Sequence, residues 1–253
     1  MNCRVTGTHD GMVAVVSGAA RGIGRALAEG LAARGAHLVA VDVLDPGETA
    51  AAVVAAGGTC RPLVADVGAP ADVERIAAEV GGCDVLVNNA ALLGSTPFLE
   101  LDHAVFRETL RVNLESQFLL AKAFAPGMVE RGWGRIVNVA SSSLLTSTRG
   151  IAAYMASKGG VLGLTSALAN DLGPYGITVN AVSPGLTRTP AVEADLAAGV
   201  ITEAVLAAAQ STQAIPRAGT PEDLVGLVLF LTGKEASFVT GQFIVADGGA
   251  TRR

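Results

Sequence analysis

The sequence predicts an α/β fold, with one doubly wound domain built on a mostly parallel, seven-stranded sheet that carries helices on both faces. Three observations support this prediction. Short apolar runs alternate with helical segments along the whole chain, which is typical of parallel strands joined by helices. The runs are continuously apolar, as expected of strands buried on both faces. A length of 253 residues suits one large domain, residues 1–253, better than two small ones.

The expected strands and helices follow one another in a regular order. Strands are expected at residues 12–17, 37–43, 59–65, 84–87, 134–140, 177–182 and 242–245. Helices are expected at about 23–34, between the second strand and residue 56, at 71–80, at 101–131 with a break near Pro126, at 152–172 and at 221–231. A loop-rich segment with one short helix covers residues 186–216.

Turn-forming and capping residues mark several of these boundaries. Gly35 follows the first helix and Gly57-Gly58 follows the second, as expected of C-terminal stops. Pro174 ends the helix before it, because proline disfavours helical backbone in the preceding residue. Thr220 and Pro221 suit the N-cap and the first position of the last helix.

The composition argues against several kinds of partner. The net charge is −5 and basic residues form no block, so nucleic-acid binding is not expected. No apolar run approaches the ~20 residues of a membrane span, and the N-terminus lacks the pattern of a signal peptide. Cys3, Cys60 and Cys83 are odd in number and lack metal-ligand spacing, which indicates reduced thiols and no metal site. We therefore expect a cytoplasmic protein.

A tyrosine and a lysine are the first candidate catalytic residues. Tyr154 and Lys158 are four residues apart in a predicted helix, so their side chains share one face. An ammonium group beside a phenol lowers the phenol's pKa from its usual value near ~10, which would allow acid–base catalysis. Ser141 lies thirteen residues upstream at the end of a predicted strand, where open α/β sheets bind ligands. Taken alone, the pair also fits an ordinary helix surface.

A glycine-rich turn joins the first predicted strand to the first helix. Gly18, Gly22 and Gly24 allow a tight turn and a close approach of the backbone to a pyrophosphate. The N-terminus of the following helix adds N–H donors and a favourable dipole. The spacing differs from the common G-x-G-x-x-G motif, although the position is the same.

Two carboxylates at strand ends extend this candidate site. Asp42, eighteen residues after Gly24, can accept hydrogen bonds from a ribose diol and would repel a 2′-phosphate, which favours NAD over NADP. Arg21 argues the other way, because a basic residue beside the turn could hold that phosphate. Asp66 could accept a hydrogen bond from the adenine amino group, but an ordinary turn carboxylate fits nearly as well.

With these features, the chain resembles the short-chain dehydrogenase/reductase family in its compact group. The resemblance covers residues 11–249. Further motifs stand in the family's order, namely Asn88-Asn89-Ala90, Asn113, Pro184-Gly185, Thr189 and Asp247-Gly248-Gly249. The chain departs from the family at Ala91, where glycine is usual, and at Ala140, where serine is common. The resemblance implies a single Rossmann-type NAD-binding domain.

The resemblance also implies roles for individual residues. Tyr154 would exchange the proton of the alcohol, and Lys158 would lower the pKa of Tyr154 and hold the nicotinamide ribose. Ser141 would bind the substrate oxygen, and Asn113 would shape a helix kink and hold a water. The implied cofactor-binding residues are Gly18, Arg21, Gly22, Ile23, Gly24, Asp42, Asp66, Val67, Asn89, Ala90, Tyr154, Lys158, Pro184, Gly185, Thr187 and Thr189, and the substrate-binding residues are Ser141, Ser143, Leu93, Leu144 and Tyr154.

The segment at about 186–216 corresponds to the family's variable substrate lid. It is rich in Ala, Leu and Val, and its one candidate for binding an anion, Arg188, is expected at the lid hinge or in solvent. The residues expected to line the other wall are Leu92, Leu93, Leu144 and Leu145. A small, uncharged, hydrophobic alcohol or ketone is therefore the expected substrate. Several stretches resemble NAD-dependent aromatic secondary-alcohol dehydrogenases of the 1-phenylethanol type.

Two alternatives remain open at this point. A 3-oxoacyl-thioester reductase shares every motif, although it would be expected to carry a basic patch for its acyl carrier protein. A non-catalytic, NAD-binding regulator is a more distant alternative, because such proteins tend to lose the tyrosine or the lysine. The resemblance also implies a homotetramer, with the helices at 101–131 and 152–172 pairing across one interface and the C-terminal strand across another.

Overall fold

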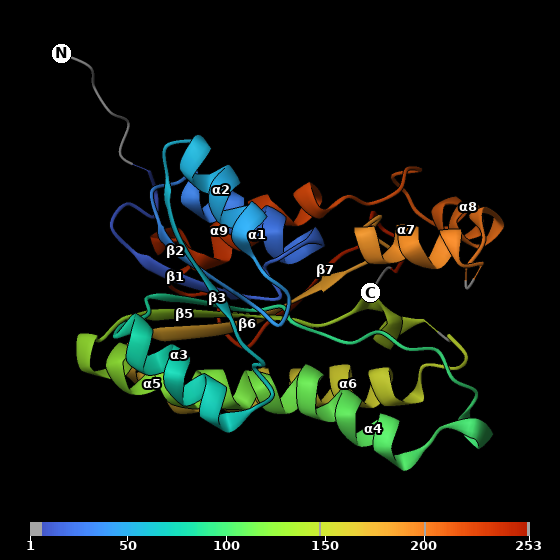
Figure 1. Ribbon diagram of the computed structural model, residues 1–253, viewed down its shortest axis with the longest axis horizontal. Coiled ribbons are helices and arrows are strands. Elements are labelled where there is room, and N and C mark those ends of the chain that lie inside the picture. Colours follow the sequence, from blue (N-terminus) through green and yellow to red (C-terminus); the bar gives the residue numbers. More distant parts are fainter. Residues whose placement is uncertain (1–6, 147, 200, 252–253) are drawn as a thin grey trace.

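The sheet predicted from the sequence is present in the computed structural model, which describes residues 7–146, 148–199 and 201–251. Seven strands form one sheet in the order β3-β2-β1-β4-β5-β6-β7, and all neighbouring pairs are parallel (Figure 1). The strands are β1 (Val13–Ser17), β2 (His37–Asp42), β3 (Thr59–Val64), β4 (Val85–Asn88), β5 (Gly134–Val139), β6 (Ile177–Pro184) and β7 (Phe243–Ala246). After β3 the chain crosses to the other side of β1, so that β4 pairs in parallel with β1.

Helices cover both faces of this sheet. Those longer than one or two turns are α1 (Gly22–Ala32), α2 (Gly47–Ala55), α3 (Pro70–Val80), α4 (His103–Leu110), α5 (Ser116–Arg131), α6 (Ala152–Leu172), α7 (Pro190–Ala197), α8 (Glu203–Ser211) and α9 (Val225–Thr232). In Figure 1, α1, α2 and α9 lie on one side of the sheet, and α3 to α6 lie on the other. The predicted doubly wound α/β architecture is therefore confirmed.

The two faces are packed by two separate hydrophobic clusters. Successive side chains of a strand point to opposite faces. In β1, Ala14 and Val16 accordingly join the cluster beneath α1 and α9, whereas Val15 joins the cluster beneath α3 and α5. All three side chains are fully buried. This two-sided burial is the physical reason why the strand sequences are continuously apolar.

The long helix expected at 101–131 is divided in a different place from the one predicted. A π-helical turn at Arg111–Glu115 separates α4 from α5, whereas Pro126 lies inside α5 without breaking it. Pro126 and Lys122, whose carbonyl loses its helical donor, both lie on the exposed side of α5, where water can replace the bond. The prediction of a break near Pro126 is therefore wrong.

Two smaller differences concern the C-terminal third of the chain. The lid segment contains two helices, α7 and α8, where one was expected. The last helix begins with a 3-10 turn at Pro221–Leu224, capped by Thr220 in a capping box with Asp223, before α9 continues. No helix among the described residues is long and apolar enough to cross a membrane. The same residues contain no group of three or more His, Cys, Asp or Glu arranged to hold a metal ion.

Candidate active site

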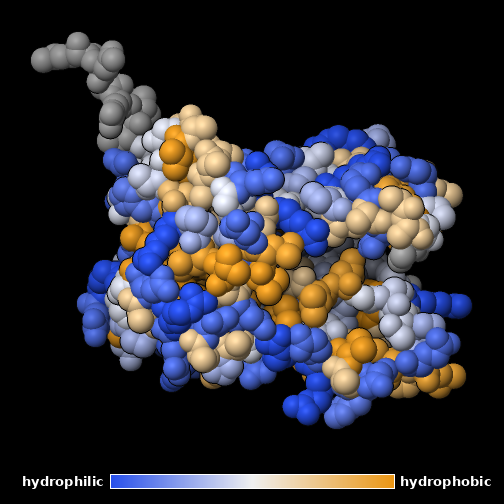
Figure 2. All heavy atoms as spheres, viewed as in Figure 1, coloured by the Kyte–Doolittle hydropathy of each residue, from blue (hydrophilic) through white to orange (hydrophobic). Residues whose placement is uncertain are grey.

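The candidate residues gather at the carboxyl ends of the central strands. Ser17 ends β1 and Gly18 follows it, Asn89 follows β4, Ser141 lies just after β5, and Pro184 ends β6. Parallel strands present these ends along one edge of the sheet. In Figure 1 the lid helices α7 and α8 project beyond this edge, and Figure 2 shows the surface hollowed beneath them. The topology therefore brings together residues that are widely separated in sequence.

The glycine turn is shaped by strict backbone requirements. Gly18 and Gly22 have φ angles of +66° and +58°, in the region that favours glycine. A Cβ atom on Gly24 would lie 2.0 Å from the carbonyl oxygen of Gly18. The turn thus forms a cradle with no side chains inside it, at the N-terminus of α1, which fits the pyrophosphate of a dinucleotide.

Residues after β4 hold this turn in place. The Asn89 side-chain amide donates to the carbonyl oxygens of Ser17 at 3.0 Å and Gly18 at 3.1 Å. The Ser17 hydroxyl in turn accepts from the backbone N–H groups of Asn89 and Ala90. The Asn89 side chain therefore supports the cradle from below. Ser17 contributes equally to this support, although no sequence motif distinguishes it from an ordinary serine at a strand end.

The two residues that bear on the choice between NAD and NADP lie beside the cradle. The Asp42 carboxylate accepts from the backbone N–H groups of Ala20 at 2.9 Å and Leu44 at 3.0 Å. These bonds fix its position while leaving lone pairs for a ribose diol. Arg21 is exposed and forms no ion pair with any described residue. Both side chains are therefore available to a cofactor.

The next two predicted cofactor residues are more constrained than the sequence suggested. One oxygen of Asp66 accepts from the backbone of Gly68 at 2.9 Å, and the other forms an ion pair with Arg111 at 2.9 Å. The side chain of Val67 is buried in the hydrophobic cluster beneath α3 and α5. Asp66 thus shares its carboxylate with Arg111, a partner that no sequence motif indicates. Val67 leaves only its backbone groups for a cofactor.

The predicted residues after β6 are mostly engaged in local structure. The Thr187 hydroxyl donates to the carbonyl of Gly185 at 3.1 Å, and Gly185 donates its N–H to Ala246 in the neighbouring strand. Thr189 caps α7 by accepting from the backbone of Val192 at 3.3 Å. A Cβ atom on Gly22 would lie 3.5 Å from the Thr189 side chain, so Thr189 faces the glycine turn. Ile23 packs against the hydrophobic cluster beneath α1 and α9.

Lys158 is a buried cation on α6. Its side chain is 1% exposed, and Nζ donates to the carbonyl oxygen of Val139 at 2.6 Å. Burial disfavours the charged form and lowers the pKa of Lys158 to about 8. Nζ lies 5.7 Å from the centroid of the Tyr154 ring. An ammonium has three N–H donors, so two remain for other partners, such as a ribose hydroxyl of a nicotinamide cofactor.

The pKa of Tyr154 is raised in the structure, whereas it was expected to be lowered by Lys158. Burial raises the pKa of the Tyr154 phenol above its usual value, and a hydrogen bond with Ser141 lowers it in part. In the protein alone, desolvation therefore outweighs the effect of the neighbouring ammonium. The Ser141 hydroxyl also lies 2.8 Å from that of Ser143, so the three hydroxyl groups form one cluster at the end of β5.

Asn113 lies in the π-helical turn and is completely buried. Its side-chain oxygen accepts from the backbone of Leu92 at 2.7 Å, and its amide donates to the Leu92 carbonyl and to the Ser157 hydroxyl. The Ser157 hydroxyl donates to the carbonyl of Tyr154 at 2.7 Å. The side chain of Asn113 thus ties the π-turn to the segment after β4 and to the helix that carries Tyr154 and Lys158.

The residues predicted to form the substrate wall are apolar, and the arginine at the lid hinge is paired within the lid. Leu93 is 62% exposed beside the site, and Leu144 is half-buried in a short 3-10 helix after Ser141. Arg188 pairs with Glu193 at 2.7 Å and with Glu203 at 3.1 Å, which links the starts of α7 and α8. Among the described residues, Arg149 forms no ion pair and lies exposed in the loop between Ser141 and Tyr154.

Comparisons with curated proteins place the chain among dehydrogenases and reductases. A family model described as enoyl-(acyl carrier protein) reductase matches residues 18–251. A 2-dehydro-3-deoxy-D-gluconate 5-dehydrogenase of Escherichia coli (strain K12) is 34% identical over 247 residues, which is 95% of each chain. The 3-oxoacyl-(acyl-carrier-protein) reductase FabG of Aquifex aeolicus (strain VF5) is 36% identical, covering 94% of this chain and 97% of its own.

Solved structures that are similar to the chain are also named as dehydrogenases or reductases. A provisionally named short-chain dehydrogenase/reductase from Burkholderia xenovorans has a TM-score of 0.93 and 36% identity, covering 98% of this chain and 99% of its own. A provisionally named NAD(P)-dependent gluconate 5-dehydrogenase from Beutenbergia cavernae, with NADP bound at low occupancy, has a TM-score of 0.89 and 38% identity. It covers 95% of this chain and 97% of its own.

Proposed function

The chain belongs to the short-chain dehydrogenase/reductase family and is an oxidoreductase acting on CH–OH groups, and we propose that it interconverts an uncharged, hydrophobic secondary alcohol and its ketone with NAD. The apolar side chains of Leu93, after β4, and of Leu144, after Ser141, are the observation that carries this proposal. The pairing of Arg188 with two glutamates supports it, because the lid then offers no free cation at its hinge. A hydrophobic pocket with few polar anchors suits such a substrate.

The proposed mechanism assigns one task to each buried polar side chain. A nicotinamide cofactor supplies the hydride chemistry when bound. Tyr154 takes the hydroxyl proton of the alcohol, and Ser141 holds the substrate oxygen against it. Lys158 would hold the nicotinamide ribose with one of its two remaining N–H donors, and it can accept the proton from the tyrosine side once it has released the proton of the other toward the interior. Asn113 fixes the π-turn next to Lys158, so that this proton has a defined route out of the site.

The preference for NAD is proposed from Asp42. Its carboxylate is held beside the glycine turn, where it would repel a 2′-phosphate. Arg21 is the competing influence, and NADP is bound in the Beutenbergia cavernae structure. Asp42→Ala should shift the ratio of kcat/KM values toward NADP, and the double variant with Arg21→Ala should lose that gain. An unchanged ratio in Asp42→Ala would refute this assignment.

A second candidate substrate class is a sugar acid. The Escherichia coli relative is named for such a substrate. Arg149 is the observation that favours this class, because it is an exposed cation without an ion pair to any described residue, in the loop that joins Ser141 to Tyr154. An arginine there could bind a carboxylate in bidentate fashion.

A substrate panel distinguishes these proposals. Hydrophobic secondary alcohols, sugar acids and carrier-bound 3-oxoacyl thioesters should be assayed with both cofactors, using Tyr154→Phe as the inactive control. The hydrophobic class should give the highest kcat/KM, and Arg149→Ala should leave it unchanged. A preference for sugar acids that Arg149→Ala abolishes would instead support the second candidate. A strong preference for carrier-bound thioesters with NADPH would refute both.

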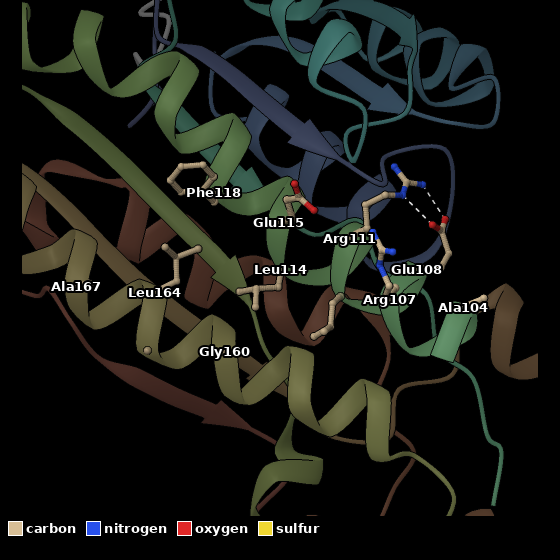
Figure 3. Close-up of a pocket in the computed structure, with 12 residues that line it drawn as sticks. Ala104, Arg107, Glu108, Arg111, Leu114, Glu115, Phe118, Gly160, Leu164 and Ala167 are labelled. Carbon is tan, nitrogen blue, oxygen red and sulfur yellow. Dashed lines mark hydrogen bonds and ion pairs between the residues drawn. The ribbon is translucent and has the colours of Figure 1, made fainter. Parts of the chain in front are cut away.

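We also propose that the chain forms a homotetramer. A groove of about 1000 Å³ lies between α4, the π-turn, α5 and α6. Its apolar side is lined by Leu114, Phe118, Leu164 and Ala167 (Figure 3). Phe118 is 48% exposed there, and a Cβ atom on Gly163 would meet nothing within 4 Å, so a second helix pair could approach closely at Gly163. A second copy of the same helices would bury this face. Light scattering after gel filtration should give a tetramer, and Phe118→Glu should reduce the oligomer.

A further inference from the structure

We propose that Gln117 is a positioning residue, which holds the main-chain carbonyl of Asn113 and one buried water at the inner end of the proton route from Lys158. The inference rests on the proposed function of the Ser141, Tyr154 and Lys158 site. Gln117 is 1% exposed, one turn after Asn113, where the π-turn joins α5. Its Nε2 donates to the carbonyl oxygen of Asn113 at 3.0 Å.

The other end of the Gln117 amide is the second observation. Its Oε1 is buried and has no hydrogen-bond partner among the described residues. Turning the amide around would not help, because it would place Oε1 against the Asn113 carbonyl oxygen. A buried acceptor without a donor costs about 1–3 kcal/mol. Protein interiors usually meet such a need with an ordered water.

One water can satisfy two acceptors at this place. It would donate one hydrogen to Gln117 Oε1 and the other to the second lone pair of the Asn113 carbonyl, while its own oxygen accepts from a third group. We assign this third group to Lys158, which follows Ser157, the partner of the Asn113 amide, and which keeps one N–H donor after its bonds to Val139 and to the ribose. The water would therefore accept a hydrogen bond from Lys158, and Gln117 and the Asn113 carbonyl would fix the orientation of that water.

The side chain and the main-chain carbonyl of Asn113 are held by different hydrogen-bond partners. Its side chain is bonded to Leu92 and to Ser157, which fixes it against α6. Its main-chain carbonyl belongs to the π-turn, whose ladder follows i→i+5 in place of the α-helical i→i+4 spacing. Gln117 supplies a side-chain donor to this carbonyl. Without that donor, the carbonyl would lose the partner that sets its direction.

The geometry predicts distinct behaviour for two Gln117 variants. Gln117→Leu removes both hydrogen bonds and should lower kcat by about tenfold, with KM values for cofactor and alcohol within about twofold of wild type. Gln117→Glu can donate to the Asn113 carbonyl only while its carboxyl group is protonated. Its kcat should therefore approach the wild-type value at low pH and fall through a new ionisation as the pH rises.

Ser116 provides a matched control on the same turn. Its buried hydroxyl donates to the carbonyl of Val112 at 2.6 Å, one residue before Asn113. Ser116→Ala should leave the pH profile of kcat unchanged. The proposal is overturned if Gln117→Leu keeps the wild-type kcat and pH profile, or if Ser116→Ala loses activity with the same pH dependence. If Gln117→Leu does not fold, Gln117→Glu decides, because a purely structural role gives no new ionisation in kcat. Inactivity of the wild-type enzyme on every alcohol would refute the proposed function, an outcome that differs from a loss of activity seen only in the Gln117 variants.

Discussion

The burial of Lys158 predicts that one substitution abolishes activity and yet stabilises the protein. We expect Lys158→Met to be inactive and to unfold at a higher temperature than wild type at pH 7, in the absence of cofactor. The wild-type protein buries an ammonium whose hydrogen-bond partner is the neutral carbonyl of Val139. A methionine of similar length would fill the same space without a charge.

The magnitude follows from the pKa of Lys158. Lowering this pKa from 10.5 to about 8 corresponds to about 3 kcal/mol of destabilisation at neutral pH, at about 1.4 kcal/mol per tenfold change in proton binding. The variant also leaves the Val139 carbonyl without its donor, which costs about 1–3 kcal/mol. A net gain of about 1 kcal/mol remains, or about 2–4 °C in Tm for a chain of this size.

The pH dependence gives the sharper test. Below pH 8 both the folded and the unfolded wild-type protein carry the proton on Lys158. Between pH 8 and 10.5 the folded protein releases it while the unfolded chain keeps it, so wild-type stability rises with pH relative to the variant. Thermal unfolding of both proteins followed by circular dichroism at pH 7, 8, 9 and 10 would measure this. A wild-type minus variant difference that stays constant across this range would refute the argument.

Two further predictions concern stability. Gly24→Ala should lower the free energy of unfolding by about 1–3 kcal/mol and weaken cofactor binding, because its Cβ would meet the Gly18 carbonyl at 2.0 Å. Calorimetry would measure the stability of this variant, and titration with NAD would measure its cofactor binding. Gly226→Ala in α9 is the control and should be neutral or stabilising, because a Cβ there meets nothing within 4 Å. Equal effects of the two substitutions would contradict this reasoning. Burial lowers the pKa of His9 below 6.5, so the unfolded chain binds a proton that the folded chain resists, and stability should fall as the pH drops below 6.5. Urea unfolding at pH 7 and 5 should show this loss in wild type and in His103→Gln but a smaller one in His9→Gln, and equal losses in all three would count against it.

The sequence predicts the sheet well because burial on both faces leaves a direct mark on composition. A run such as Val13–Ser17 has one plausible structure once its helical neighbours are recognised. The glycine turn is equally readable, since positive φ angles and a 2.0 Å approach to a carbonyl exclude other residues at Gly18 and Gly24. These features depend on local geometry, which a single stretch of sequence can report.

Features that depend on partners far away in the sequence could not be predicted. The ion pair between Asp66 and Arg111 joins residues 45 positions apart, and neither position alone indicates the other. The π-turn around Asn113 has no characteristic composition, whereas Pro126 is a recognisable helix breaker in the sequence. The pKa of Tyr154 is set by burial, which the spacing to Lys158 does not report.

The pairing of β1 with β4 has a consequence for synthesis of the chain. Ala14 pairs with Val85, so one edge of β1 has no partner until about 70 further residues have been made. At about 5–20 residues per second, this takes roughly 4–14 s. During that time the nascent chain would expose an apolar strand edge, a feature that favours aggregation. The glycine turn can form its hydrogen bonds with Asn89 only after β4 and Asn89 have been synthesised.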